Sequence, residues 1–157
     1  MLKRSLLVLT CMALGSAKAA GRTGGYDQLV KALQQGDDIR AIVHIEKCTP
    51  KNAAAAKYGS AYAAETNFPF TLFSHYVLNE SPARYTVATS NSVMLEHHLL
   101  GLVQAYGRLR IFENNQAELH TAYFDPKTYE KKISMDFDCT VSTKNADQAI
   151  VLIDKNN

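Results

Sequence analysis

Histidines close to carboxylates are the first residues in this sequence that could do chemistry. Two such pairs are spaced two positions apart: Glu96 with His98, and Glu118 with His120. On a β-strand, residues two apart point to the same face, so each pair could offer two ligands to a zinc ion. His97 and His98 are adjacent, and on a strand they would face opposite sides and could not ligate one metal together.

The two Glu–His pairs are expected to lie too far apart to share a metal ion. The strand that contains Arg108 and Arg110 should lie between them, which separates the pairs by about 9–10 Å, or two strand spacings. Pairing of Glu118 and His120 with these arginines across adjacent strands is the simpler explanation. We therefore expect no metal site.

The second candidate for chemistry is the adjacent pair Ser74 and His75. A serine and a histidine are the core of a hydrolytic triad, but neighbours on a strand face opposite sides. The sequence contains no GxSxG motif and no Walker, GxGxxG or HExxH motif. We expect a non-enzymatic protein without a cofactor, and a small secreted hydrolase using Ser74 or a histidine is the alternative.

The cysteines point to a structural role. The chain has three, and Cys11 lies in an N-terminal segment that we expect to be removed. The remaining two, Cys48 and Cys139, form no CxxC motif, which argues against a redox or zinc-ribbon site. An even count in an exported chain favours a disulfide, with two buried thiols as the main alternative. A bridge would make the strands that carry these cysteines neighbours in a sheet or in facing layers.

The N-terminus has the three parts of a secretory signal peptide. Lys3 and Arg4 precede an apolar run at 6–14, and small residues follow as far as Ala20. The run is too short to span a membrane, which takes about 20 residues of helix. We expect cleavage after Ala19 or Ala20.

Removal of residues 1–19 would leave 20–157, the length of a single domain. The formal charge would change from +2 to −1, because three basic residues and no acidic residue are lost. A near-neutral chain lacks the basic surface that nucleic-acid binding requires, so no nucleic-acid partner is expected. No later segment is apolar and long enough to be transmembrane, so a periplasmic or secreted location is expected.

One helix is expected near the start of this domain. Apolar residues recur at helical spacing between positions 26 and 35, and Gly36 follows where helix C-termini favour glycine. From Ile39 to Cys48 the residues alternate and are rich in β-branched types, which predicts a strand. Residues 51–67 combine an Ala-rich run with a turn-like Tyr-Gly-Ser stretch. We expect a loosely ordered segment there that leads into a strand.

The rest of the chain predicts antiparallel strands separated by turns. Strands are expected at 68–78, 84–89, 93–100, 104–112, 117–124, 129–141 and 149–153, with turns at 79–82 and 90–92. The predicted fold class is α+β, with the N-terminal helix packed on a curved antiparallel sheet of seven or eight strands. A small barrel is the leading closed form, because a long open sheet leaves unpaired edges.

One turn can be predicted from register. Leu109 and Ile111 should face the same core as Leu119 and Thr121, so odd-numbered residues should pair with odd-numbered residues. The index sum of paired residues is then even, which requires a loop of odd length. We predict a three-residue loop within 113–116 instead of a two-residue Asn-Asn turn.

Aromatic residues lie on most of the predicted strands or at their ends. They must supply much of the core volume, because the chain has no tryptophan. They either simply fill the core or line an apolar cavity in a curved sheet that would hold a lipid-like ligand. They are Phe68, Phe70, Phe73, Tyr76, Tyr85, Tyr106, Phe112, Tyr123, Phe124, Tyr129 and Phe137.

Three stretches of the chain resemble the VirK family, a small family of exported proteobacterial proteins named from a virulence region of plant-associated bacteria. The first, at 26–48, runs as a tyrosine, a helix, a glycine, a strand and a cysteine. The second is 73–79 with the Arg-Tyr pair at 84–85, and the third is 110–139. The Ala-rich segment at 51–67 resembles the family least.

The resemblance covers nearly all of 20–157 and includes no catalytic signature. It implies export, contact with a host and an association with virulence, and it implies nothing about catalysis. Together with the composition, it predicts an exported non-enzymatic protein that binds a host or envelope partner or a small apolar ligand.

Overall fold

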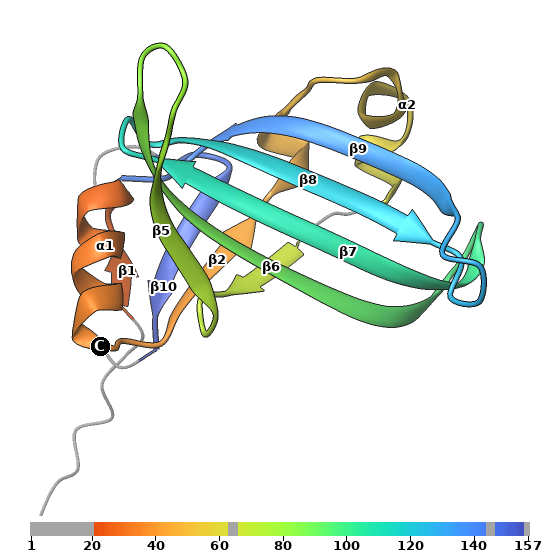
Figure 1. Ribbon diagram of the computed structural model, residues 1–157, viewed down its shortest axis with the longest axis horizontal. Coiled ribbons are helices and arrows are strands. Elements are labelled where there is room, and N and C mark those ends of the chain that lie inside the picture. The colour runs from red at the N-terminus through yellow and green to blue at the C-terminus, as the bar shows by residue number, and fades with distance from the viewer. Residues whose placement is uncertain (1–20, 63–65, 144–146, 156–157) are drawn as a thin grey trace, which may run out of the picture.

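A computed structural model describes residues 21–62, 66–143 and 147–155 of the chain, apart from the side chains of 60–62. The predicted signal peptide and its cleavage site up to Ala20 lie outside the described residues. The described residues form ten strands in two antiparallel sheets, two α-helices and one 3-10 turn (Figure 1). No helix among them is long and apolar enough to cross a membrane.

The four-stranded sheet has the order β1-β10-β2-β4, and the six-stranded sheet has the order β3-β9-β8-β7-β6-β5. The bounds in the smaller sheet are β1 (Gly21–Thr23), β2 (Ile39–Val43), β4 (Thr66–Pro69) and β10 (Ile150–Asp154). In the larger sheet they are β3 (Thr49–Pro50), β5 (Phe73–Leu78), β6 (Arg84–His97), β7 (Gly101–Phe112), β8 (Gln116–Phe124) and β9 (Lys131–Thr140). The larger sheet curves across the molecule, with α1 (Gly25–Gln35) at one end and α2 (Ala53–Tyr62) towards the other (Figure 1).

The α+β class and the antiparallel pairing are as predicted, but the single sheet of seven or eight strands is wrong. Neither sheet closes into a barrel in the part of the chain that the structure describes. The chain instead crosses between the two sheets. The predicted strand at 39–48 is too long, because β2 ends at Val43 in the smaller sheet and a 3-10 turn (η1, Ile45–Lys47) follows. Beyond the predicted strand, β3 joins the larger sheet.

The predicted strand at 68–78 is divided between the two sheets. β4 ends at Pro69 in the smaller sheet, and β5 begins at Phe73 in the larger one. Between them, the backbone carbonyls of Pro69 and Leu72 both accept hydrogen bonds from the hydroxyl of Thr89, at 2.8 and 3.0 Å. A side chain of β6 therefore satisfies the polar backbone of the crossing segment.

The turn predicted at 90–92 is also wrong, because β6 continues through it. Ser90, Asn91 and Ser92 pair with Arg108, Gly107 and Tyr106 of β7. These three residues of β6 are exposed, so their polar side chains stay hydrated and lower the stability of the fold little. Polar residues in an exposed part of a paired strand gave the sequence pattern of a turn.

The helix predicted at 26–35 is confirmed, and α1 buries Leu29 and Leu33 in the core. It ends at Gly36, whose φ of 82° is the left-handed conformation that glycine adopts easily. The loose order predicted at 51–67 is wrong for 53–62, where α2 forms; 63–65 lie outside the described residues, and the expected strand follows as β4. α2 packs on β9 with its small residues, since a Cβ added to Gly59 would lie 2.8 Å from the ring of Phe137.

The predicted three-residue hairpin loop is confirmed. β7 ends at Phe112 and β8 begins at Gln116, so residues 113–115 form the loop. Leu109 pairs with Leu119 and Ile111 with Ala117, so odd residues do pair with odd. The same parity holds from β6 to β9, because Val87 pairs with Ile111 and Ala117 with Cys139. Odd-numbered residues of these four strands therefore share the inner face of the larger sheet.

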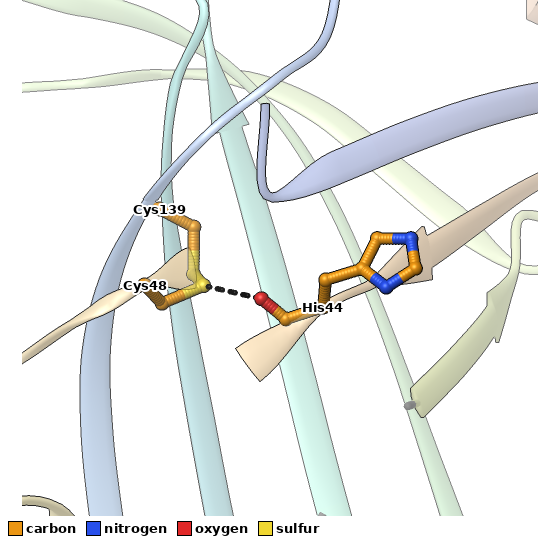
Figure 2. The surroundings of a disulfide bond; sticks show 3 residues. All are labelled: His44, Cys48 and Cys139. Carbon is orange, nitrogen blue, oxygen red and sulfur yellow. Dashed lines mark hydrogen bonds between the residues drawn. A yellow bond between two sulfur atoms is a disulfide. The ribbon is translucent and has the colours of Figure 1, made fainter. Parts of the chain in front are cut away.

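Cys48 and Cys139 form a disulfide, as expected from the sequence (Figure 2). Their Cα atoms are 4.5 Å apart. Thr49 pairs with Asp138 and Pro50 with Phe137, so the same register places Cys48 opposite Cys139. The bridge therefore fastens the short edge strand β3 to β9 within one sheet, and Cys139 is buried on the inner face.

Candidate ligand-binding cleft

The two Glu–His pairs lie in different parts of the larger sheet. Arg110 pairs with Glu118 on one side and with Ala88 on the other, and Ala88 is eight residues from Glu96 along β6. At about 3.3 Å per residue, Glu96 and Glu118 are offset by roughly 26 Å along the strands, in addition to two strand spacings across the sheet. The separation is larger than expected from the sequence, because the pairs differ in position along the strands as well as across them. Among the described residues, no group of three or more His, Cys, Asp or Glu is placed to hold a metal ion.

His97 and His98 do not face opposite sides, because β6 ends at His97 and His98 lies in the turn that follows. Their rings stack with centroids 4.8 Å apart. The Nδ1 atom of His97 accepts hydrogen bonds from the backbone N–H groups of Leu99 and Leu100, at 3.1 and 3.3 Å. Burial, and then the neighbouring His98, lower the pKa of His97. His97 thus acts as a neutral acceptor that organises the turn.

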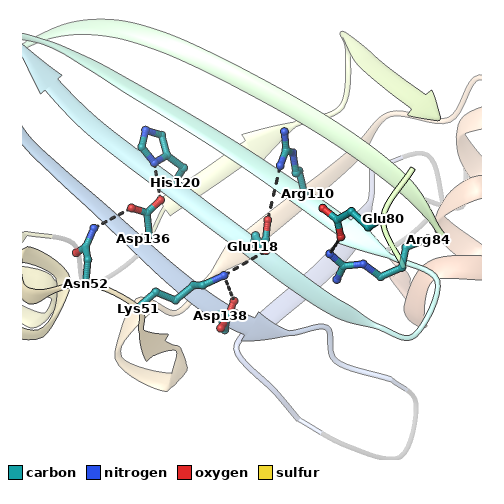
Figure 3. A network of polar contacts seen from close by, with 9 residues as sticks. All are labelled: Lys51, Asn52, Glu80, Arg84, Arg110, Glu118, His120, Asp136 and Asp138. Atoms are coloured by element: carbon teal, nitrogen blue, oxygen red, sulfur yellow. Dashed lines mark hydrogen bonds and ion pairs between the residues drawn. The ribbon is translucent and has the colours of Figure 1, made fainter. Parts of the chain in front are cut away.

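Glu118 and His120 belong to a polar network on the outer face of the larger sheet (Figure 3). The predicted register is confirmed, with Arg110 opposite Glu118 and Arg108 opposite His120. Lys51 lies 3.2 Å from Glu118 and 3.1 Å from Asp138. The hydrogen bond to Asp138, followed by the one to Glu118, raises the pKa of Lys51.

His120 is hydrogen-bonded to a different partner than expected. Its Nδ1 atom lies 2.6 Å from Asp136, the residue opposite it on β9. The other carboxylate oxygen of Asp136 accepts a hydrogen bond of 2.8 Å from Asn52, which precedes α2. The network therefore joins the start of α2 to the outer face of the sheet (Figure 3).

In the described part of the chain, the hydrogen-bond partner of His75 is a tyrosine and not Ser74. Ser74 and His75 lie next to each other on β5, and His75 Nε2 is 3.0 Å from the hydroxyl of Tyr26 on α1. The serine in the cross-strand row of His120 is Ser90, but Arg108 stands between them. Ser90 is thus about 9–10 Å from His120 across two strand spacings, too far for direct proton transfer.

A cleft of about 590 Å³ lies on the inner face of the larger sheet. Its sheet residues are mainly odd-numbered positions of β6 to β9, and β4, η1 and α2 contribute Phe68, Ile45 and Gly59. The volume lies within the usual range of small-molecule sites, about 300–1,000 Å³. The lining is mostly apolar and includes Phe68, Tyr123 and Phe137 from the predicted set of aromatic residues.

Small residues of β7 form the floor of the cleft. Gly107 lies in a cross-strand row with Asn91, Thr121 and Met135, and Ala105 lies in the next row along the strand. A Cβ added to Gly107 would lie 2.8 Å from the ring of Phe68. The absence of a side chain at Gly107 therefore makes room for the Phe68 ring over the sheet.

Some of the predicted aromatic residues fill the core, and some border the cleft. Phe68, Phe70, Phe112 and Phe137 are at most 3% exposed and fill the core. Phe68 and Phe137 also border the cleft. Asn91 and Gly107 were missed as site residues because the sequence places Asn91 in a turn. The signal that could have found them is the parity of the strands, which puts Asn91, Gly107 and Thr121 on one face.

Both the sequence and the fold are similar to those of known proteins. Residues 22–129 match the family model described as VirK protein. Among curated proteins, none matches the chain. A solved structure with a similar fold is lpg1832, a VirK family protein from Legionella pneumophila. It is 13% identical, with a TM-score of 0.58, and the match covers 83% of this chain and 97% of that one. The chain belongs to the VirK family.

Proposed function

We propose that the protein is an exported, non-enzymatic binding protein that takes a small, mostly apolar ligand in the cleft of its larger sheet. The observation that carries the proposal is the cleft itself, about 590 Å³ with aromatic and aliphatic walls. Apolar surface that stays open in a folded protein is a common mark of a binding site. Val93 on the cleft wall is 54% exposed, which fits this mark.

Titration of the purified protein with the neutral dye Nile red tests the proposal. We expect saturable binding at one site, with the rise in fluorescence that an apolar environment causes. Ala105→Phe fills the floor of the cleft and should abolish most of this binding. Gln104→Phe is the matched control, because the neighbouring residue of β7 faces the other side of the sheet. Equal binding by wild type and Ala105→Phe would overturn the proposal.

A protein partner is the second candidate, and a separate surface favours it. Leu72 is 83% exposed just before the edge strand β5, and Phe73 and Val77 on that strand are 43% and 42% exposed. Exposed apolar residues on an edge strand are typical of protein-binding surfaces. Crosslinking in intact cells would test it, because Phe73→Ser with Val77→Ser should lose adducts that Ala105→Phe retains. Adducts unchanged in both variants would exclude this surface.

A further inference from the structure

The cleft differs from a simple apolar pocket in the kind of polar group that it contains. The polar side chains that its lining residues present on the inner face are all neutral: Thr66, Asn67, Asn91, Thr121 and Tyr123. None of the described residues that line it is charged. A charged ligand group would lose its hydration there without gaining an opposite charge, which is strongly unfavourable. The lining therefore selects against carboxylate, phosphate and ammonium groups.

Thr121 has an unused hydrogen-bonding group at the centre of this lining. It pairs with Gly107 on one side and Met135 on the other, so its side chain belongs to the inner face. Its Oγ1 atom is buried and has no hydrogen-bond partner in the structure. An unpaired buried hydroxyl destabilises the folded state, so a valine would suit the unliganded protein better. Rotation about χ1 between staggered positions can turn this hydroxyl towards the cleft.

Asn91 adds a second polar group beside the same point. It lies opposite Gly107 in the same cross-strand row, and its Oδ1 would be 3.3 Å from a Cβ at Gly107. Asn91 is exposed, whereas Thr121 is half-buried, so the two residues mark an outer and an inner position of one row. The Phe68 ring covers Gly107 itself, so a ligand would lie beside this ring, where it could reach the amide of Asn91 and the hydroxyl of Thr121.

We propose that the cleft binds uncharged amphipathic molecules, with a hydroxyl or amide group hydrogen-bonded to Thr121 and Asn91 and an alkyl chain along the apolar walls. This inference rests on the proposed function and names its ligand class. Fatty alcohols and fatty amides have this chemistry. Fatty acids and alkylamines of the same chain length carry a charged head group at neutral pH instead.

Displacement of Nile red by ten-carbon ligands tests the charge requirement. Decanol and decanamide should displace the dye at concentrations at least ten times lower than decanoate or decylamine at pH 7.5. If the dye binds but decanoate competes equally well, the ligand class is wrong and the proposed function stands. If the dye does not bind in the cleft at all, the proposed function itself fails.

Thr121→Val tests the hydroxyl. The variant should melt at a higher temperature than wild type when free, because it removes an unpaired buried hydroxyl while keeping the side-chain shape. It should bind decanol five- to tenfold more weakly than wild type. Thr140→Val is the matched control, because this even-numbered residue of β9 faces the outer side, and it should show neither effect.

The possible outcomes separate a ligand contact from a structural role. A lower melting temperature for Thr121→Val would show that the hydroxyl stabilises the free protein and would overturn its assignment to a ligand. Unchanged decanol affinity would also overturn it. Weaker decanol binding in a variant that is at least as stable as wild type supports the contact, because loss of folding cannot explain it.

Discussion

Asn115 joins three segments that are far apart in the sequence. It occupies the third position of the β7–β8 loop with a φ of 62°, in the left-handed region that asparagine tolerates better than most residues. Its Oδ1 accepts a hydrogen bond of 2.7 Å from the backbone N–H of Tyr26 in the first turn of α1. Its carbonyl accepts one of 2.9 Å from the backbone N–H of Val141, after β9. Gly24, at the N-cap position of α1, offers no side-chain acceptor, so Asn115 supplies it.

Substitution of Asn115 by alanine should be clearly destabilising. Loss of a helix cap costs about 1 kcal/mol, and the left-handed backbone costs alanine about 1–2 kcal/mol more. Asn115→Asp keeps an acceptor at the positive end of the helix and should remain close to wild type. Urea unfolding measures the difference. Asn114→Ala is the control, because its Oδ1 serves the exposed N–H of Gln116 within the loop. Equal losses for the two alanine variants would contradict the capping role.

Asp125 should titrate at an unusually acidic pH. Hydrogen bonds from the backbone N–H groups of Lys127 and then Thr128, followed by the Lys132 side chain, lower its pKa to about 2. The folded pKa is below the unfolded value of 3.8, so the stabilisation is complete above pH 3.8 and is lost as pH falls through 2. An NMR titration of the carboxyl carbon measures this. Asp125→Asn should abolish the part of the stability change that Asp125 causes between about pH 4 and pH 2. A titration midpoint of the Asp125 carboxyl near 4 would contradict the predicted shift.

At the residue scale, the sequence predicts pairings better than it predicts the site. The spacing of Leu109, Ile111 and Leu119 determines parity because one face of the hairpin is buried. The same parity places Thr121 on that face. Its proximity to Asn91 depends on β6 continuing past Ser90, and exposed polar residues there carry no periodic signal. To predict a site that combines residues from four strands, the register of each strand must be known.

At the element scale, α2 shows why local patterns fail for closely packed segments. Alanine propensity favours a helix at 53–56, but the glycine at position 59 argues against its continuation. In the structure, Ala55 and Gly59 lie one helical turn apart and both are buried. Any side chain at Gly59 would collide with Phe137. The glycine lowers helix propensity and at the same time allows the helix to approach the sheet.

Removal of the disulfide should destabilise the whole larger sheet. Cys48 and Cys139 are 91 residues apart, and closing a loop of that length is worth about 4–5 kcal/mol in the chain-entropy model. The edge strand β3 has two residues, so it depends on the bridge more than on its own pairing. The Cys48→Ser, Cys139→Ser double variant should melt well below wild type, as measured by calorimetry.

Reductant provides the matching experiment for the bridge. Wild type in reductant should melt near the temperature of the double variant, and reductant should leave the double variant unchanged. Equal melting temperatures for wild type with and without reductant, with thiol titration showing the bridge reduced, would contradict a stabilising role.

At the scale of the whole molecule, two crossings between sheets separate the structure from the predicted single sheet. The chain moves from β2 to β3 through η1, and from β4 to β5 through residues 70–72. Both crossing segments keep buried apolar residues, Ile45 in the first and Phe70 in the second. Their hydrophobicity therefore resembles that of a continuous strand. Sequence alternation shows which residues are buried, but it does not show in which sheet they are buried.

The remaining prediction concerns export, which would explain the signal sequence and the disulfide and would leave the first strand intact. Cleavage after Ala19 or Ala20 would leave β1 whole, because β1 begins at Gly21 and pairs with β10 from its first residue. Disulfides persist in oxidising compartments, so the bridge also favours export.

When the full chain is expressed in a proteobacterium, mass spectrometry of the exported fraction should show a start at Ala20 or Gly21 and no free thiol. A matched chain with Leu6–Leu9 replaced by polar residues should stay in the cytoplasm, keep its N-terminal segment and carry reduced cysteines. An exported form that retains Met1 would refute cleavage, and free thiols in the exported form would refute the link between export and the bridge.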